Sequence, residues 1–321
     1  MKILVTGVAG FIGYHLSKKL INFKYDVYGI DNLNNYYDVV LKKDRIKELK
    51  KNNNFYFSKI DLINKNKINK ILKENNIKYI VHLAAQAGVR YSIKNPGVYF
   101  KSNLEGFFNI LELAKNNKVK HLIFASTSSV YGDNSKIPLV ENMNTDKPLS
   151  FYAATKKSNE VMAYSYSNIY NLPSTALRFF TVYGPFGRPD MSLFKFTQSI
   201  LSNKKIPLFN HGNHIRDFTY IDDIIEGIFL IIKKPSKDII PYNCFNIGGG
   251  KPNKLKFFLN LIEKSLKKRS KIKNLPLQLG DVKKTHSNIS KLKKYTSYKP
   301  TTNLEKGIIK FIDWYKKYYK V

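Results

Sequence analysis

The chain has little of three things: cysteine, acidic residues and long apolar runs. Cys244 is the one cysteine among 321 residues, which excludes an internal disulfide framework and favours a reducing compartment. The longest apolar candidate, 224–232, is interrupted by Glu226 and Gly227 and falls short of the ~20 residues that span a bilayer. The chain opens on an apolar stretch with no basic segment before it, unlike a secretory signal. We therefore expect a cytoplasmic protein without a membrane segment.

Metal ligands and repeats are also lacking. No group of His, Cys and carboxylate residues has the spacing of a metal site, and no segment repeats along the chain. The adjacent Asp222 and Asp223 precede an apolar helical pattern, and acidic residues favour a helix N-terminus. We interpret them as the start of a helix and expect no metal.

The deficit of acidic residues leaves a large positive charge. Lys and Arg number 55 against 23 Asp and Glu, which gives a net charge of +32. Such an excess fits nucleic acid, a membrane surface or an acidic small substrate. The lysines are spread along the chain, and the longest basic cluster, 264–273, is short. This spread favours a solvated basic surface and no nucleic-acid partner, while 43% hydrophobic residues suffice for a full core.

The start of the chain has the pattern of a strand, a glycine-rich turn and a helix. An apolar strand at 3–5 precedes the turn, and a helical pattern over 14–22 follows it. Gly7 permits a tight turn, Gly10 lets the backbone approach a pyrophosphate, and Gly13 lets the helix pack on the strand. The helix N-terminus then faces the phosphate charge. The pattern predicts the first unit of a dinucleotide-binding fold.

A second strand at 26–30 ends at Asp31. An acidic residue at this place accepts hydrogen bonds from the adenosine ribose hydroxyls, and its charge repels a 2′-phosphate. Asp31 therefore favours NAD over NADP. The alternative is that Asp31 only caps a turn or helix.

Further strands alternate with helical patterns, which predicts a doubly wound parallel sheet. Asp61, Ala84 and Thr127 follow the ends of such strands, where ligands bind in this architecture. Asp61 suits the adenine amino group, or else the N-cap of the next helix. His82 lies inside an apolar run and is expected to be a buried structural histidine. The strands are expected at 55–57, 79–83 and 121–125.

The second half of the chain changes in character after a sixth strand at 174–180. A Gly/Pro-rich segment at 181–189 predicts a loop and a domain border. Two domains are expected: 1–175, with return segments near 210–235, and 176–321. The latter is predicted to hold helices at 191–203 and 224–233, a basic helix reaching Lys273, and a last amphipathic helix through Trp314.

The stretch 126–156 carries the candidate chemistry. Tyr152 and Lys156 are four residues apart, so on a helix they share one face. An ammonium lowers the pKa of a neighbouring phenol from its usual value of about 10. A hydroxyl cluster from Ser126 to Ser129 follows an apolar strand and suits the holding of a substrate alcohol. The arrangement indicates proton removal from a carbinol, the partner step of hydride transfer.

Together these motifs resemble the extended short-chain dehydrogenase/reductases, and within them the sugar-nucleotide 4-epimerases. The glycine loop, Thr127 and the Tyr152-x-x-x-Lys156 pair match that family's motifs. More specifically, the segments 29–38, 84–92, 280–282 and 298–315 resemble UDP-glucuronate 4-epimerases. The resemblance covers nearly the whole chain. It implies a Rossmann domain that binds NAD, a smaller C-terminal α/β domain that binds a UDP-sugar, and a helix-paired homodimer.

The mechanism implied by the resemblance is oxidation and re-reduction at C4 of the sugar. Tyr152 removes the proton of the 4-hydroxyl, a transient 4-keto sugar forms, and Thr127 hydrogen-bonds the reacting oxygen. Lys156 lowers the pKa of Tyr152 and holds the nicotinamide ribose. Cofactor contacts are expected from Gly7, Gly10, Phe11, Ile12, Gly13, Asp31, Asn32, Asp61, Leu62, Leu83, Ala84, Ala85, Asn103, Tyr152 and Lys156.

By resemblance, the two residues after Thr127 favour epimerisation over dehydration or decarboxylation. Related dehydratases and decarboxylases carry an acidic residue there, whereas this chain has Ser128 and Ser129. An epimerase acting on a glucuronate must restrain the sugar carboxylate, and Arg suits this because it can make two parallel bonds. Substrate contacts are expected from Arg90, Ser128, Ser129, Thr181, Arg188, Arg216 and Asp281.

Several alternatives remain at this point. The substrate can be UDP-glucose instead, or the reaction a decarboxylation of UDP-glucuronate. A non-catalytic NAD-binding scaffold on the same fold is a different class of function. Arg188 can be solvated in its loop, and Arg90 can form a purely structural ion pair.

Overall fold

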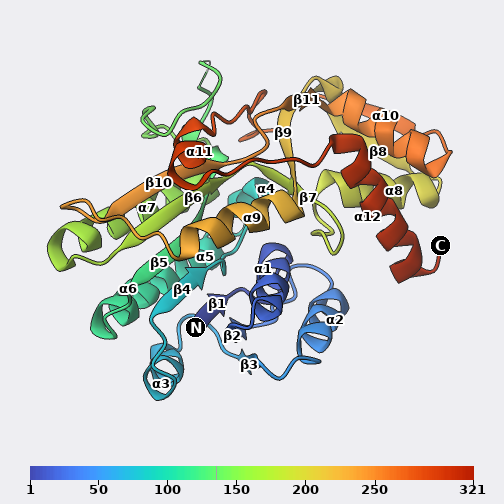
Figure 1. Ribbon diagram of the computed structural model, residues 1–321. Coiled ribbons are helices and arrows are strands. Elements are labelled where there is room, and N and C mark those ends of the chain that lie inside the picture. Colours follow the sequence, from blue (N-terminus) through green and yellow to red (C-terminus); the bar gives the residue numbers. More distant parts are fainter. Residues whose placement is uncertain (135) are drawn as a thin grey trace.

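A computed structural model describes residues 1–134 and 136–321, and it centres on a seven-stranded sheet (Figure 1). The strands lie in the order β10-β6-β5-β4-β1-β2-β3, and every neighbouring pair is parallel. The predicted doubly wound parallel sheet is confirmed. The strand bounds are β1 Lys2–Thr6, β2 Asp26–Asp31, β3 Phe55–Lys59, β4 Tyr79–His82, β5 His121–Thr127, β6 Ser174–Phe179 and β10 Tyr242–Ile247.

Helices cover both faces of this sheet. Ile3 and Val5 belong to one core cluster and Leu4, between them, to another, because successive strand residues point to opposite faces. α1 and α9 pack together over the first cluster, and α3, α6 and α7 over the second. The helix bounds are α1 Phe11–Asn22, α2 Val39–Leu49, α3 Lys65–Glu74, α4 Val89–Lys94, α5 Pro96–Tyr99, η1 Phe100–Glu105, α6 Gly106–Asn116, η2 Ser128–Tyr131, α7 Phe151–Tyr170 and α9 Ile221–Ile232.

The smaller α/β part holds two further sheets. In one, β9 pairs in parallel with β7 and antiparallel with β11; in the other, β8 and β12 are parallel. α8, α10 and α12 pack around them, at the upper right of Figure 1. The bounds are β7 Thr181–Tyr183, α8 Ser192–Leu201, β8 Lys205–Phe209, η3 Asn210–Gly212, β9 Ile215–Tyr220, β11 Pro252–Lys254, α10 Leu255–Leu266, β12 Lys271–Leu275, α11 Ser290–Thr296 and α12 Leu304–Tyr319.

The predicted basic helix reaching Lys273 is wrong. α10 ends at Leu266, since Lys267 adopts a left-handed conformation with φ of +54°. The chain then forms β12, whose residues pair with β8. The predicted loop at 181–189 also differs, because its first residues form β7 beside β9. Both strands depend on distant partners, which the local sequence pattern does not reveal.

The large sheet draws strands from both parts of the chain. β6 spans the expected border after residue 175, and β10 returns to lie beside β6. α9 likewise returns to pack on α1. The division into 1–175 and 176–321 stays a prediction, and the chain clearly passes back into the large sheet after it has formed β7, β8 and β9.

Two local predictions are confirmed. His82 is 2% exposed and its Nδ1 lies 2.8 Å from Thr6 Oγ1, so it is a structural histidine. Asp222 and Asp223 stand in the first turn of α9. In the ranges 1–134 and 136–321, no helix combines the length and the apolar character needed to cross a bilayer.

Candidate active site

A cleft of about 1040 Å³ lies at the carboxyl ends of the parallel strands. The strand order reverses between β1 and β4, and a crevice forms where neighbouring crossovers diverge. This volume is at the upper end of the range for small-molecule sites. All the expected site residues except Asn103 line the cleft; they are Gly7, Gly10, Phe11, Ile12, Gly13, Asp31, Asn32, Asp61, Leu62, Leu83, Ala84, Ala85, Arg90, Thr127, Ser128, Ser129, Tyr152, Lys156, Thr181, Arg188, Arg216 and Asp281.

The glycine-rich turn is sterically closed to larger residues. Gly7 has φ of +72°, and a Cβ there would lie 2.7 Å from Ala84 N. A Cβ on Gly13 would lie 2.2 Å from Gly7 O, so α1 can approach β1 only with glycine at this position. The first i→i−4 bond of α1 joins Tyr14 N to Gly10 O. The backbone N–H groups before Tyr14 therefore stand at the mouth of the helix, where they suit an anionic phosphate.

Asp31 is fixed by the turn that it faces. Its carboxylate accepts bonds from Ala9 N at 3.1 Å and Leu33 N at 2.8 Å. Burial raises the pKa of Asp31, against the opposing effects of these N–H groups and of the nearby Lys42 and Arg45 charges. Asp31 thus caps the turn at Leu33, as in the alternative interpretation, and it also lines the cleft.

Asp61 lies beside Asn32 in the same part of the cleft. Asn32 Nδ2 donates to Asp61 Oδ2 at 2.8 Å, which joins the ends of β2 and β3. The N-cap alternative for Asp61 is wrong, because Asn64 caps α3 by accepting from Lys67 N.

Asn103 lies behind the cleft wall. It is 1% exposed, its Oδ1 accepts from Gln86 N at 2.8 Å, and its Nδ2 donates to Gln86 O and Thr155 Oγ1. Its side chain therefore holds the strand-end segment 84–88 against α7. The direct cofactor contact expected of Asn103 stays a prediction.

Thr127, Tyr152 and Lys156 come together from two elements. Thr127 ends β5, and Tyr152 and Lys156 stand one turn apart near the start of α7. Ser150 begins α7, since its Oγ accepts from Ala153 N at 3.2 Å. Lys156 is 2% exposed, and its Nζ donates to Ala125 O at 2.9 Å. The helix cap and the strand end thus fix the three side chains at one wall of the cleft.

Burial shifts the pKa of two members of this trio. Burial raises the pKa of Tyr152, while the charge of Arg188 and the Thr127 side chain act to lower it. Burial lowers the pKa of Lys156 to about 8, against the charge of Glu160. Arg188 thus contributes a charge that favours the phenolate, and the same role expected of Lys156 stays a prediction.

Arg188 is already engaged by a carboxylate. Its Nε and Nη2 donate to Asp190 at 3.0 and 2.6 Å, and Tyr36 Oη donates to the same carboxylate at 3.2 Å. The alternative of a solvated Arg188 is wrong, since its side chain is 24% exposed and paired. The Nε–Nη2 edge is occupied by Asp190, so a ligand carboxylate would meet the Nη1 side of the guanidinium.

The far end of the cleft holds the other predicted cations. Arg90 Nη2 lies 3.2 Å from Asp281 Oδ2, so the alternative of an ion pair applies to Arg90. Its guanidinium also lies 4.6 Å from the Phe209 ring centroid. Arg216 donates to three backbone carbonyls, including Val282 O at 2.7 Å, and burial lowers its pKa to about 10. Both cations are thereby held in place at the cleft wall.

Sequence reasoning missed Tyr36, Lys42, Asp190 and His214, which also line the cleft. Asp190 stands two residues after Arg188, so a signal for this pair was present in the sequence. Tyr36 lies 154 residues from Asp190, and no local pattern joins them. Lys42 donates to Asn34 O at 2.6 Å, which orders the segment after β2.

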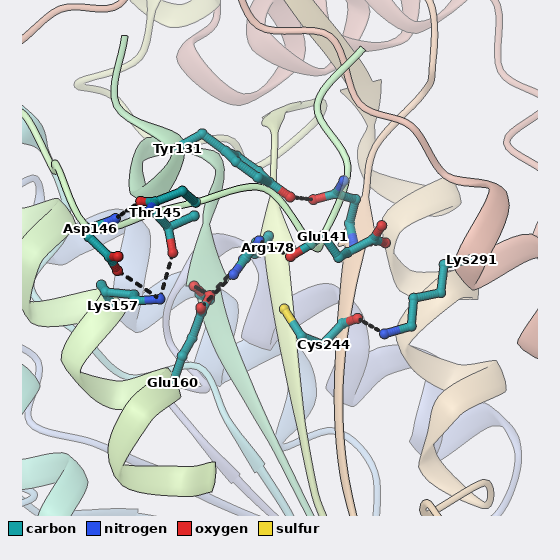
Figure 2. Close-up of polar contacts among 12 residues, drawn as sticks. Tyr131, Glu141, Thr145, Asp146, Lys157, Glu160, Arg178, Cys244 and Lys291 are labelled. Carbon is teal, nitrogen blue, oxygen red and sulfur yellow. Dashed lines mark hydrogen bonds and ion pairs between the residues drawn. The ribbon is translucent and has the colours of Figure 1, made fainter. Parts of the chain in front are cut away.

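A buried ion pair supports the wall behind the trio (Figure 2). Arg178 on β6 makes two bonds to Glu160 on α7, of 2.9 and 2.7 Å, and both side chains are 5% exposed. Arg178 also donates to Glu141 O, and its guanidinium stacks 4.8 Å from the Tyr131 ring centroid. In Figure 2 the guanidinium points between α7 and the segment that carries Glu141. Ser126 Oγ, at the end of β5, donates to Glu160 Oε1 at 2.5 Å.

Among the residues that the structure describes, no three His, Cys, Asp or Glu side chains are grouped so as to hold a metal ion. Cys244 is buried and unpaired.

Comparison with known proteins gives consistent matches over the whole chain. Residues 3–248 match the NAD dependent epimerase/dehydratase family. Protein CapI of Staphylococcus aureus is 49% identical over 334 residues, with all of both chains covered. UDP-glucuronate 4-epimerase of Thermodesulfobacterium geofontis is 44% identical, with 98% of this chain and 95% of that protein covered.

A solved structure is similar over nearly the same extent. It is UDP-glucuronic acid 4-epimerase from Bacillus cereus in complex with UDP-glucuronic acid and NAD. The TM-score is 0.93 at 37% identity, and the match covers 99% of this chain and 100% of that one.

Proposed function

The chain belongs to the NAD-dependent epimerase/dehydratase family, and we propose that it interconverts UDP-glucuronate and UDP-galacturonate by epimerisation at C4. The observation that carries the proposal is a single cleft lined by Thr127, Tyr152, Lys156 and Arg188. A base, a hydroxyl and two cations in one cleft suit oxidation of a carbinol on an acidic sugar. The similar proteins named as UDP-glucuronate 4-epimerases support this choice of substrate.

The dinucleotide end of the cleft fits NAD. The glycine turn has no side chains that would keep a pyrophosphate from the backbone. The N–H groups at the start of α1 suit the negative charge of that pyrophosphate. Asp31 would hold the adenosine ribose and disfavour a 2′-phosphate. When bound, NAD supplies the redox chemistry that oxidises the carbinol at C4 and reduces the resulting ketone.

The chain's own residues move and hold the proton. Tyr152 takes the proton of the 4-hydroxyl and returns it after the sugar has turned over in the cleft. Its pKa is raised by burial, so the charge of Arg188 and the Thr127 side chain are needed to favour the phenolate. Thr127 hydrogen-bonds the reacting oxygen. Lys156 positions the nicotinamide ribose and adds positive charge beside the phenolate.

Restraint of the sugar carboxylate separates epimerisation from decarboxylation. The 4-ketone of a glucuronate is a β-keto acid, which loses CO₂ when the breaking bond aligns with the carbonyl π system. We assign Arg188, Thr181 and Ser128 to hold the carboxylate out of that alignment. Arg188 is pre-oriented by Asp190, so its position does not depend on the ligand. Ser129 and Ser128 present hydroxyls where a carboxylate would be needed for dehydration.

The deciding experiment is a product assay on UDP-glucuronate with no added cofactor. We expect UDP-galacturonate to form, with no CO₂ and no UDP-pentose. Turnover of UDP-glucose alone would refute UDP-glucuronate as the substrate. Release of CO₂ would support the decarboxylase alternative. No turnover of either sugar, with NAD still bound, would favour the NAD-binding scaffold.

The same assay on an arginine variant tests the carboxylate contact. We expect Arg188→Met to raise KM for UDP-glucuronate strongly or to release CO₂. Arg269, whose side chain is 90% exposed, provides the matched control, since Arg269→Met should leave both quantities unchanged.

We also propose a homodimer that pairs α6 and α7 with their copies. Phe108 on α6 and Val161 and Tyr164 on α7 are exposed apolar side chains on neighbouring helices. Light scattering should report a dimer, and Val161→Glu should convert it to a monomer. A monomeric unmodified protein would contradict the proposal.

We place the protein in the cytoplasm, because its one cysteine is buried and forms no disulfide. Cell fractionation tests this placement. Recovery outside the cytoplasmic fraction would overturn it.

A further inference from the structure

Arg45 is a fully buried guanidinium that joins two turns next to the cleft. It projects from α2 and has an exposed fraction of 0%. Its Nη1 donates to Ala9 O at 2.7 Å and to Tyr37 Oη at 2.8 Å. Its Nη2 donates to Phe186 O at 2.6 Å and to Gly187 O at 3.2 Å. One planar group therefore bonds the glycine-rich turn and the turn before Arg188.

The contacts of Arg45 are unusual for a buried charge. In the part of the chain that the structure describes, Arg45 forms no ion pair with a carboxylate. A buried cation is costly unless its donors are bonded. Backbone carbonyls and the Tyr37 hydroxyl accept from Nη1 and Nη2, whereas the buried Nε has no partner among the residues that the structure describes. The rigid fork of Arg fixes the spacing between its partners, which a flexible Lys cannot do. The geometry thus suits positioning of backbone better than simple charge pairing.

The turn held by Arg45 needs such support. Gly184 has φ of +146° and Phe186 has φ of +54°, so a non-glycine residue adopts a left-handed conformation just before Arg188. Such a conformation is strained in a residue with a side chain and persists only where the surroundings enforce it. The carbonyl of Phe186 is one of the groups that Arg45 bonds.

A second link joins the segment after Asp31 to the surroundings of Arg188. Tyr36 lies in the segment between β2 and α2, and its hydroxyl donates to Asp190 at 3.2 Å. Asp190 in turn holds Arg188 through two bonds. Both links start in the segment that follows Asp31 and end at Arg188 or its neighbours.

We infer that Arg45, assisted by Tyr36, is a positioning residue that couples the dinucleotide turn to the orientation of Arg188. This inference rests on the proposed function for the identity of the ligand, a sugar carboxylate. Ordering of the turn around Ala9 by the dinucleotide favours the placement of Arg188, and a carboxylate on Arg188 favours retention of the dinucleotide. The two effects are equal in free energy, because coupling between two binding sites is reciprocal.

The test compares acidic and neutral ligands on the NAD-loaded enzyme. Arg45→Lys keeps the charge and removes the fork. We expect its Kd for UDP-glucuronate, measured by calorimetry, to rise about 10-fold, within the usual range of coupling between sites. The Kd for UDP-glucose should change much less, because that ligand carries no carboxylate for Arg188. Equal losses for both ligands, or no loss, would overturn the inference.

Release of NAD provides a readout that does not depend on turnover. In the unmodified enzyme, saturating UDP-glucuronate should slow the loss of NAD more than UDP-glucose does. In Arg45→Lys this difference should disappear. If the difference persists in the variant, Arg45 does not carry the coupling.

Tyr318→Phe is the matched control. The Tyr318 hydroxyl on α12 bonds Asp44, the neighbour of Arg45 on α2. The Tyr318 ring lies 6.0 Å from the Phe186 ring, and phenylalanine keeps this contact, so the variant removes only the hydroxyl. We expect Tyr318→Phe to bind UDP-glucuronate and UDP-glucose with the same relative Kd values as the unmodified enzyme. If it loses UDP-glucuronate affinity as Arg45→Lys does, the effect comes from general loosening of α2, and the inference is overturned. If Arg45→Lys does not fold, Tyr36→Phe decides, with selective weakening of UDP-glucuronate in support and no selectivity against.

These outcomes differ from failure of the proposed function. Turnover of UDP-glucuronate by the unmodified enzyme is measured alongside. Its absence would refute the proposed reaction, whereas unselective losses in an active enzyme would refute only the coupling.

Discussion

Ser126 and Arg178 are partners on the adjacent strands β5 and β6, and both donate to the same oxygen of Glu160. Glu160 stands one helical turn after Lys156 on α7. The carboxylate therefore locks α7 against the strand ends, directly behind the candidate catalytic residues. The stability of the site therefore depends on the ion pair between Arg178 and Glu160.

Removal of one partner of this ion pair should be strongly destabilising. We expect Arg178→Met to lower the free energy of unfolding by about 3–5 kcal/mol, because Glu160 would remain buried and unpaired. The double variant Arg178→Met with Glu160→Leu should recover most of the loss. Urea unfolding measures both. A double variant no more stable than the single one would contradict the argument.

An exposed pair provides the control for that comparison. Lys70 and Glu74 lie 3.7 Å apart on α3, with side chains that are 73% and 59% exposed. Lys70→Met should change the free energy of unfolding by less than about 0.5 kcal/mol, because solvent screens such pairs.

Loss of the Tyr152 hydroxyl should remove the catalytic base while the cleft keeps its shape. We expect Tyr152→Phe to lower kcat by about 10²- to 10⁴-fold, the usual contribution of a positioned acid–base group. NAD content per chain should stay the same. Tyr170→Phe, at the exposed end of the same helix, should retain full turnover. Unchanged kcat in Tyr152→Phe would remove Tyr152 from its assigned role.

A methyl group at Gly7 should disturb the dinucleotide turn. Gly7→Ala places a Cβ 2.7 Å from Ala84 N in a left-handed conformation, so we expect about 1–3 kcal/mol of lost stability and loss of bound NAD. Gly97→Ala is the control, because its Cβ meets nothing within 4 Å and it lies in α5. Similar behaviour of the two variants in thermal unfolding and NAD content would count against the close-approach argument.

Buried histidines should make the protein sensitive to acid. Burial lowers the pKa of His82 to about 3 from its usual 6.5. Below pH 6.5 the unfolded chain binds a proton that the folded chain does not, so stability is full above pH 6.5 and falls as pH decreases toward 3. The slope for one such group is about 1.4 kcal/mol per pH unit.

The histidine prediction is checked by substitution. His82→Gln should give a shallower loss of unfolding free energy than the unmodified protein between pH 6 and pH 4.5. His121, whose pKa burial lowers to about 4, should behave in the same way. Parallel slopes in variant and unmodified protein would show that His82 does not titrate as described.

The sequence was most informative where local spacing carries the constraint. The intervals between Gly7, Gly10 and Gly13 and the four-residue step from Tyr152 to Lys156 were sufficient to place the cleft residues that they predicted. The acidic end of β2 was equally readable, since Asp31 directly follows an apolar strand. These features depend on neighbouring residues, so a single segment is enough to recognise them.

Features that are formed by segments distant in the chain could not be predicted from the sequence. β8 and β12 are short strands that exist because they pair with each other, and the lysines of β12 gave the segment the look of a basic helix. The charge of Arg188, on a loop 36 residues after Tyr152, acts to lower the pKa of Tyr152, and no local pattern joins the two residues. A sequence pattern reveals residues that are close along the chain, whereas the interaction between two charges depends on their distance in space.

The return of β10 to the large sheet has a consequence for how the protein is made. The cleft takes residues from Gly7 near the start of the chain to Asp281 near its end, and β10 flanks β6 only after β7, β8 and β9 have been synthesised. A nascent chain on the ribosome can form β1 to β5 early but cannot complete the site. Every truncated product that ends before Asp281 would thus lack part of the cleft wall.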